Sequence, residues 1–121
     1  MNLSQEGIVR ISENVIEQIA IQALARVIGI KPASPNHESE GAEGKGRKAN
    51  GGVRIQVEGD EGVVPSIAVD AFILTKYGLR IPDISWYVQE SIKSTLEQFT
   101  GYNVKGVNVF AQGVYLDEEK E

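Results

Sequence analysis

The sequence predicts an α/β (α+β) domain in which two helices pack on one face of a four-stranded, mainly antiparallel sheet. Two stretches carry apolar residues every three to four positions, which is the period of an amphipathic helix. Other stretches alternate apolar and polar residues, which is the period of a half-buried strand. The elements follow the order β-α-β-β-α-β, which favours a two-layer domain, and a ferredoxin-like arrangement is the simplest topology with that order.

The pattern is clearest from Val63 to Tyr102. A long strand comes first, and its alternate positions form one apolar row of Ile67, Val69, Ala71 and Ile73. Pro82 suits the first turn of the helix that follows, because its φ is fixed near the helical value and it has no N–H to lose. Gly101 supplies the left-handed residue that ends this helix. Its predicted inner face consists of Ile84, Val88, Ile92, Leu96 and Phe99.

The elements on either side are shorter or less regular. Gly7–Ile11 is a short β-rich run, and Ser12 suits the N-cap of a helix that Gly29 ends. Residues 53–58 alternate as a strand with one wet face. The last predicted strand, residues 104–116, changes phase near Lys105 and again near Gly113, and such slips beside glycines indicate bulges.

Residues 1–121 are predicted to form a single domain. Lys31–Gly52 lacks aromatic and β-branched residues and is dense in Gly, Pro, Ser and charge, so we expect a mobile loop there. It belongs inside the domain, because neither flank can bury its apolar face alone. Asp117–Glu121 is predicted to be a solvated acidic tail.

The composition excludes several classes of protein. A net charge of −5 disfavours non-specific binding to DNA, RNA or an anionic membrane. The absence of cysteine excludes disulfides, thiolate nucleophiles and cysteine metal sites, and it is compatible with the cytoplasm. We predict no secretion signal and no direct membrane insertion, because no basic segment precedes an apolar one and no apolar run is long enough to span a bilayer.

No catalytic residue, cofactor site or metal site is predicted, and we expect a protein that is not an enzyme. His37 lies alone in the polar loop, and the acidic residues around it lack the spacing of a calcium loop. Gly44–Ala49 matches a dinucleotide-binding fingerprint in letters only, since it neither follows a strand nor opens a helix. Asp70 has no evident acid or base partner and is predicted on the solvent-facing row of its strand.

Five residues are candidates for protein contacts. The helical phase places Trp86 opposite the predicted inner face, and an outward tryptophan is typical of binding hot spots. The alternative is that the polar loop or a neighbouring strand covers it. Tyr87 lies at the edge of the core and suits either interpretation. Phe72, Leu74 and Phe110 are predicted on the sheet face away from the helices, where they need a partner or another cover.

A small RNA-binding α/β module is the alternative function. Lys45, Arg47 and Lys48 with Phe72 and Phe110 would then form a basic and aromatic surface. The acidic net charge weighs against this alternative.

Several short motifs, taken in order, resemble the alkaline shock protein 23 family of bacterial envelope-stress proteins. The resemblance covers nearly the whole chain except the polar loop and the acidic tail, and no single motif in it is specific. The motifs are Gly7–Ser12, Val15-Ile16 with Ile19-Ala20, Lys76–Gly78 with Ile81–Asp83, Val88-Gln89, Thr100-Gly101, Val107–Val109 and Gln112–Val114.

The resemblance implies a small cytoplasmic protein without known catalytic activity. It further implies self-assembly into a homo-oligomer and a membrane-anchored protein partner that holds the protein near the membrane. We therefore expect a non-enzymatic interaction or scaffold protein of the alkaline-shock type, linked to cell-envelope stress homeostasis. The family supplies no catalytic residue to assign here, and the long polar loop departs from its pattern.

Overall fold

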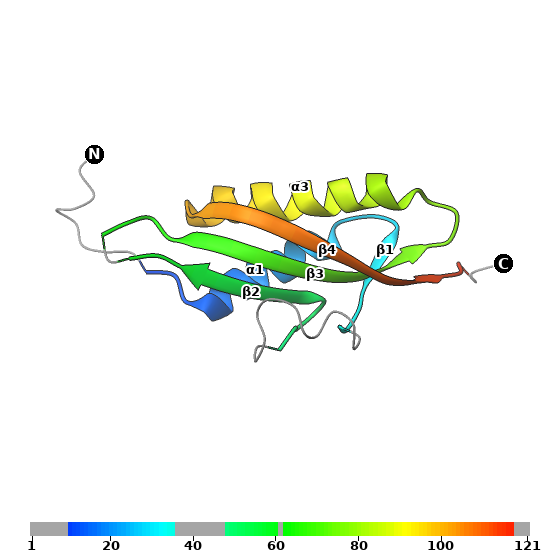
Figure 1. Ribbon diagram of the computed structural model, residues 1–121, viewed down its shortest axis with the longest axis horizontal. Helices are drawn as coiled ribbons and strands as arrows, with labels where there is room; N and C mark the ends of the chain where they lie inside the picture. Colours follow the sequence, from blue (N-terminus) through cyan, green and yellow to red (C-terminus); the bar gives the residue numbers. More distant parts are fainter. Residues whose placement is uncertain (1–9, 36–47, 61, 118–121) are drawn as a thin grey trace.

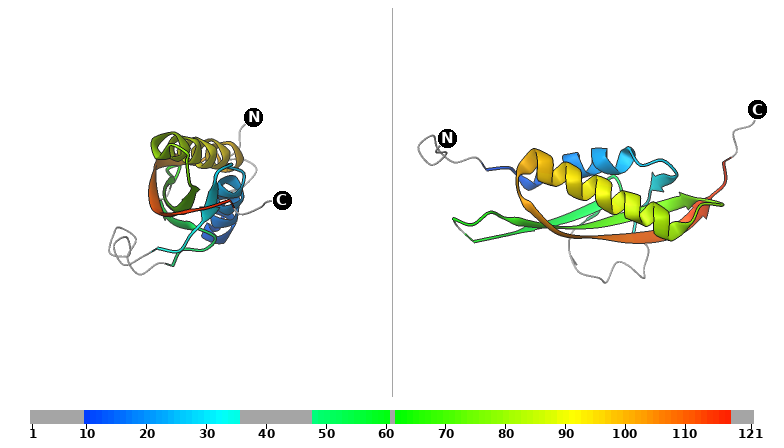
Figure 2. Two further views of the ribbon diagram at one scale, coloured as in Figure 1. Left: turned by 90° about the vertical axis from the view of Figure 1, so that its right-hand side faces the viewer. Right: turned by 90° about the horizontal axis from the view of Figure 1, so that it is seen from above.

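The protein folds into two layers, with two helices on one face of a four-stranded sheet (Figures 1 and 2). The computed structural model describes residues 10–35, 48–60 and 62–117. This confirms the predicted α+β class. The elements in chain order are α1 (Glu13–Ala25), β1 (Ile30–Pro32), β2 (Val53–Glu58), β3 (Ser66–Lys76), α3 (Ile81–Thr100) and β4 (Asn103–Tyr115).

Strand β3 is the centre of the sheet. β2 pairs antiparallel with its first half, from Ser66 to Ala71, and β1 pairs antiparallel with its end, from Ile73 to Thr75. β4 runs parallel to β3 along almost its whole length. The sheet is therefore mainly antiparallel, as predicted, with one parallel pair joined through α3.

The first predicted strand differs from the structure. Arg10 and Ile11 belong to no strand, and residues 7–9 lie outside the described residues. The short strand β1 instead follows α1, and its last two residues, Lys31 and Pro32, fall in the stretch predicted as a loop. Gly29, at φ +96°, lets the chain turn back after the helix, and its carbonyl accepts a hydrogen bond from the Lys76 N–H at 3.0 Å. The sequence did not indicate β1, because a strand of only three residues that contains lysine and proline has no alternating pattern. Pro32 is tolerated in it because β1 lies at the margin of the sheet, where a missing N–H breaks no hydrogen bond.

The described order is therefore α-β-β-β-α-β. A ferredoxin-like sheet places a strand from before the first helix between the two parallel strands. Here β3 and β4 are direct neighbours, so that arrangement is not the one formed.

The start of α1 and both ends of α3 follow the predicted chemistry, whereas α1 ends at Ala25 with Arg26 as its C-cap, before the predicted stop at Gly29. The Ser12 hydroxyl accepts a hydrogen bond from the Val15 N–H at 3.2 Å, which satisfies one free donor at the start of α1. Pro82 lies in the first turn of α3, with Asp83 beside it, and Gly101 at φ +74° closes the helix. Both predicted phase changes in β4 are present, as register shifts opposite the pairs Ile67/Ala68 and Ile73/Leu74 of β3.

One hydrophobic core lies between the helices and the sheet. Phe99 was predicted on the inner face of α3, but this prediction is wrong. It is 62% exposed and lines a groove between α1 and α3. The buried apolar residues are Ile16, Ala20, Ala23 and Leu24 of α1, Ile84, Val88, Ile92 and Leu96 of α3, and Val53, Ile55, Ile67, Val69, Ala71, Ile73, Val104 and Val107 of the sheet.

We predict that Gly52→Ala destabilises the fold more than Gly62→Ala. Both residues have positive φ, so both variants carry strain of about 1–2 kcal/mol. A Cβ on Gly52 would also lie 2.9 Å from Cβ of Pro32 and 3.0 Å from the Phe72 carbonyl oxygen, whereas a Cβ on Gly62 meets nothing within 4 Å. Overpacking adds about 1–3 kcal/mol at the first site. Urea unfolding of both variants measures the difference, and equal losses would contradict this packing.

Candidate functional site

The sheet face away from the helices is closed by an aromatic stack. The Phe72 and Phe110 rings lie 5.0 Å apart between centroids, at 14° to each other, because β3 and β4 place these two residues side by side. The guanidinium carbon of Arg54 lies 5.0 Å from the Phe72 ring centroid. Phe72 is 0% exposed, so it offers no surface to a partner, while Leu74 and Phe110 are half-buried.

A buried ion pair stands beside this stack. Arg54 is 4% exposed and Asp70 is 8% exposed, although sequence alternation predicted both on a wet face. Arg54 Nε donates to Asp70 Oδ2 at 3.2 Å, and Nη2 lies 3.1 Å from the same oxygen without being aligned for a hydrogen bond. Asn108 Nδ2 donates to the other carboxylate oxygen at 3.0 Å. Both oxygens of Asp70 are thus held by structural partners, which is the arrangement of a packing element rather than of a free acid or base.

Trp86 and Tyr87 form an accessible aromatic pair on α3. Their rings meet edge to face, with centroids 5.2 Å apart. Trp86 is 55% exposed and Tyr87 is 56% exposed, so about half of each residue faces water. The outward direction predicted for Trp86 from the helical phase is confirmed. The rigid helix holds both rings in place, because its opposite side is fixed in the core through Ile84 and Val88.

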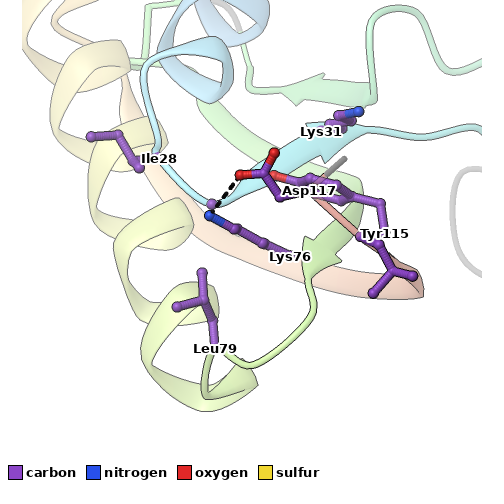
Figure 3. A pocket seen from close by; sticks show the side chains of 8 residues that line it. Ile28, Lys31, Lys76, Leu79, Tyr115 and Asp117 are labelled. Atoms are coloured by element: carbon purple, nitrogen blue, oxygen red, sulfur yellow. Dashed lines mark ion pairs between the residues drawn. The ribbon is translucent and has the colours of Figure 1, made fainter. Parts of the chain in front are cut away.

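A surface depression of about 880 Å³ opens at the end of the sheet where β3 and β4 finish (Figure 3). The sequence did not reveal it, since its residues come from three separate segments of the chain. Lys76 forms an ion pair with Asp117 at 3.2 Å, and Lys31 Nζ lies 4.4 Å from the Tyr115 ring centroid. The lining residues are Ile28, Gly29, Lys31, Lys76, Leu79, Tyr115, Leu116 and Asp117.

Large apolar side chains are concentrated at this same end. Ile28 is 88% exposed, although nothing in the helical period distinguishes it from a core residue. We call the set the apolar end, and Figure 1 shows this region where the loop after β3 leads into α3. Its members are Ile28, Tyr77, Leu79, Ile81, Val114 and Leu116.

The other motifs considered in the sequence contribute no site within the described residues. His37 and most of Gly44–Ala49 lie outside the described ranges. In residues 10–35, 48–60 and 62–117 no three His, Cys, Asp or Glu side chains are grouped to hold a metal ion. Over those same ranges no helix is long and apolar enough to cross a membrane.

Comparison with known proteins gives one consistent family. The sequence profile of the alkaline shock protein 23 family, described as having a cell envelope-related function, matches residues 1–116. The chain is 34% identical over 111 residues to the protein YloU of Bacillus subtilis, covering 89% of this chain and 88% of YloU. It is 28% identical over 116 residues to YqhY of Bacillus subtilis, covering 95% of this chain and 82% of YqhY. The Streptococcus pyogenes protein Spy1535 is 26% identical over 113 residues, which cover 93% of this chain and 82% of Spy1535. No solved structure matches the chain.

We predict that Asp70→Leu lowers the free energy of unfolding by about 3–5 kcal/mol, because it leaves the buried Arg54 charge without a counter-ion. Replacing both partners, as Arg54→Met with Asp70→Leu, should recover much of this loss. The matched control is Lys76→Met, which breaks a surface pair and should cost less than about 1 kcal/mol. Urea unfolding measures all three. An Asp70→Leu loss no larger than that of the control would contradict a tightly coupled buried pair.

Proposed function

Because the chain belongs to the alkaline shock protein 23 family, whose function is cell envelope-related, we propose that it is a non-enzymatic interaction protein. In this proposal it works in the cytoplasm as a scaffold of the alkaline-shock type. It holds a membrane-anchored protein partner, associates with further copies of itself, and thereby serves the homeostasis of the cell envelope under stress.

The observation that carries the proposal is the exposed pair of Trp86 and Tyr87. Two large aromatic rings held in water by a rigid helix bury considerable apolar area when a partner covers them, at little cost in side-chain entropy. A monomer gains nothing from leaving them exposed. The pair therefore supports a contact surface on the outer side of α3.

The apolar end supports the same proposal from a second place on the molecule. Ile28, Leu79 and Leu116 border the depression, and Lys31 and Lys76 add positive charge beside them. Apolar patches with polar rims are typical of protein contact sites. The two surfaces provide room for more than one partner, as a scaffold requires.

The proposal assigns membrane attachment to the partner. A chain with a net charge of −5 gains little from anionic lipid, since attraction to such lipid amounts to only about 1 kcal/mol for each basic residue near the surface. A membrane-anchored protein that docks on Trp86 would place the chain near the membrane without requiring its insertion.

No specific observation favours the alternative role in RNA binding. Base stacking requires accessible rings, and Phe72 is fully buried beneath Arg54 and against Phe110. Lys45 and Arg47, which would supply the positive charge, lie outside the described residues.

We predict that Trp86→Glu abolishes capture of the membrane-anchored partner. Tagged chain is incubated with gently solubilised membranes, and bound integral membrane proteins are identified at low and moderate salt. Phe99→Glu is the matched control, because it places the same charge at an exposed aromatic position on the same helix. Wild type and Phe99→Glu should recover the same partner, and Trp86→Glu should lose at least about tenfold of it, or about 1.4 kcal/mol of binding free energy.

The experiment has two outcomes against the proposal. Equal capture by Trp86→Glu and wild type would remove Trp86 from the contact surface. Recovery of nucleic acid that washes off as salt rises would favour the RNA-binding alternative instead.

A further inference from the structure

We propose that copies of this chain join head to tail, with the turn between β2 and β3 of one copy inserted into the depression of the next. The described residues of this turn are 59, 60 and 62–65, and the depression is the one at the end of β3 and β4 (Figure 3). The contact rests on the proposed self-association and assigns two surfaces to it. Because these surfaces differ from each other, a pair of copies still has one turn and one depression available for further copies.

The turn between β2 and β3 carries two valines that the core does not bury. Val63 is 61% exposed and Val64 is 62% exposed. The backbone fixes their position, because the Val63 N–H donates to the Asp60 carbonyl at 3.0 Å and Gly62, at φ +81°, supplies the positive φ that such a turn requires. Turn residues are normally polar. Two adjacent exposed valines are instead the kind of apolar surface that a partner covers.

The turn and the depression lie at opposite ends of the long axis of the molecule. Figure 1 shows the turn before β3 at one end and the finish of β3 and β4 at the other, and the view from above in Figure 2 agrees. The 11 residues of β3, at about 3.3 Å each, separate the two by roughly 30 Å or more. A copy therefore cannot place its own turn in its own depression, so only another molecule can fill it.

The depression offers apolar side chains to the valines of the turn. Ile28 is 88% exposed, Leu79 is 42% exposed and Leu116 is 64% exposed, and all three line it. Figure 3 shows Ile28 and Leu79 on one side, with Lys31 on the other. The volume of about 880 Å³ lies in the range of pockets that enclose a ligand, which is about 300–1,000 Å³. The depression is thus large enough for the tip of a turn.

Charge complementarity favours this turn as the occupant. Asp60 is exposed on the turn, and Lys31 is exposed at the depression. Neither belongs to an ion pair of the described residues, since the Lys31 Nζ lies 4.4 Å from the Tyr115 ring centroid rather than beside a carboxylate. Insertion of the turn brings the Asp60 carboxylate to the Lys31 ammonium group. Opposite charges beside an apolar contact add specificity and fix its orientation.

A head-to-tail row keeps the proposed partner site available on every copy. Trp86 lies on the outer side of α3 and belongs neither to the turn nor to the lining of the depression. A row of copies therefore presents Trp86 repeatedly, so one row can bind several membrane-anchored partners at once. Such multivalent binding is tighter than a single contact without requiring any new one.

The test is the association of the purified chain, measured by sedimentation equilibrium. The weight-average mass of wild type should rise with concentration beyond that of a dimer. Val64→Asp in the turn and Ile28→Asp at the depression should each raise the dissociation constant at least about tenfold, because each places a charge in an apolar contact. Val15→Asp is the matched control, since it adds the same charge at an exposed valine of α1 outside both surfaces. Circular dichroism checks that all variants fold equally.

A mixing experiment distinguishes a head-to-tail contact from a symmetric one. Val64→Asp keeps an intact depression, and Ile28→Asp keeps an intact turn. An equal mixture of the two variants should form a dimer and nothing larger, because the turn and the depression that remain are both altered. In a symmetric interface the same surface of both copies takes part, so mixing would restore nothing.

A charge exchange tests whether the acidic turn meets the basic side of the depression. Asp60→Lys alone and Lys31→Glu alone should each weaken association, because each brings like charges together. The double variant that carries both changes should recover association toward that of wild type.

Three results would overturn the inference: a wild-type chain that stays monomeric at high concentration, a mixture of Val64→Asp and Ile28→Asp that stays monomeric, or a double charge variant that recovers nothing. Failure of this contact is distinguishable from failure of the partner contact. A monomeric wild type that still captures the membrane-anchored partner through Trp86 overturns only the head-to-tail contact. A chain that associates through the turn and captures nothing overturns only the partner contact.

Discussion

Strand β3 is the constraint on which the described structure depends, because every other strand of the sheet pairs with it. β1 and β2 share one of its edges and β4 takes the other, so β3 alone fixes the register of all of them. Its side chains must also be buried on both faces. The helices cover the row that begins at Ile67 and Val69, and the opposite row has no helix to cover it (Figure 2).

The uncovered row is closed by side chains of the sheet itself. Phe72 is stacked on Phe110, and Arg54 lies over Phe72 while it pairs with Asp70. A buried pair of opposite charges is tolerated here because hydrogen bonds from Arg54 and Asn108 satisfy both carboxylate oxygens. The consequence for function is that this face is not the accessible one. Exposed apolar side chains of the described residues lie instead on the outer side of α3 and at the apolar end.

Both surfaces arise from the short path of the chain from β3 through α3 to β4. The helix lies close enough to β4 for the Gln89 and Glu97 side chains to form hydrogen bonds with its backbone. The same packing leaves the Trp86 and Tyr87 side chains exposed to water. The turn after β3 brings Leu79 near the residues that follow α1, which forms the depression. The described residues of this chain thus present exposed apolar side chains at more than one place on the surface.

The sequence by itself determined the class of the fold, both helices, the Ser12 cap of α1, the Pro82 start and Gly101 end of α3, the long central strand and the outward direction of Trp86, because periodicity and capping are local properties. The end of α1 at Ala25, before Gly29, was not predicted. It failed at β1, where a three-residue strand of lysine and proline has no periodic signal, and the order of the elements changed with it. Only the tertiary structure decided that Phe72, Arg54 and Asp70 are buried and that segments far apart in sequence meet at the depression. The alternation of apolar and polar residues along a strand predicts which side chains point away from the helices. Which residues of the other strands then cover those side chains depends on strand pairing and register.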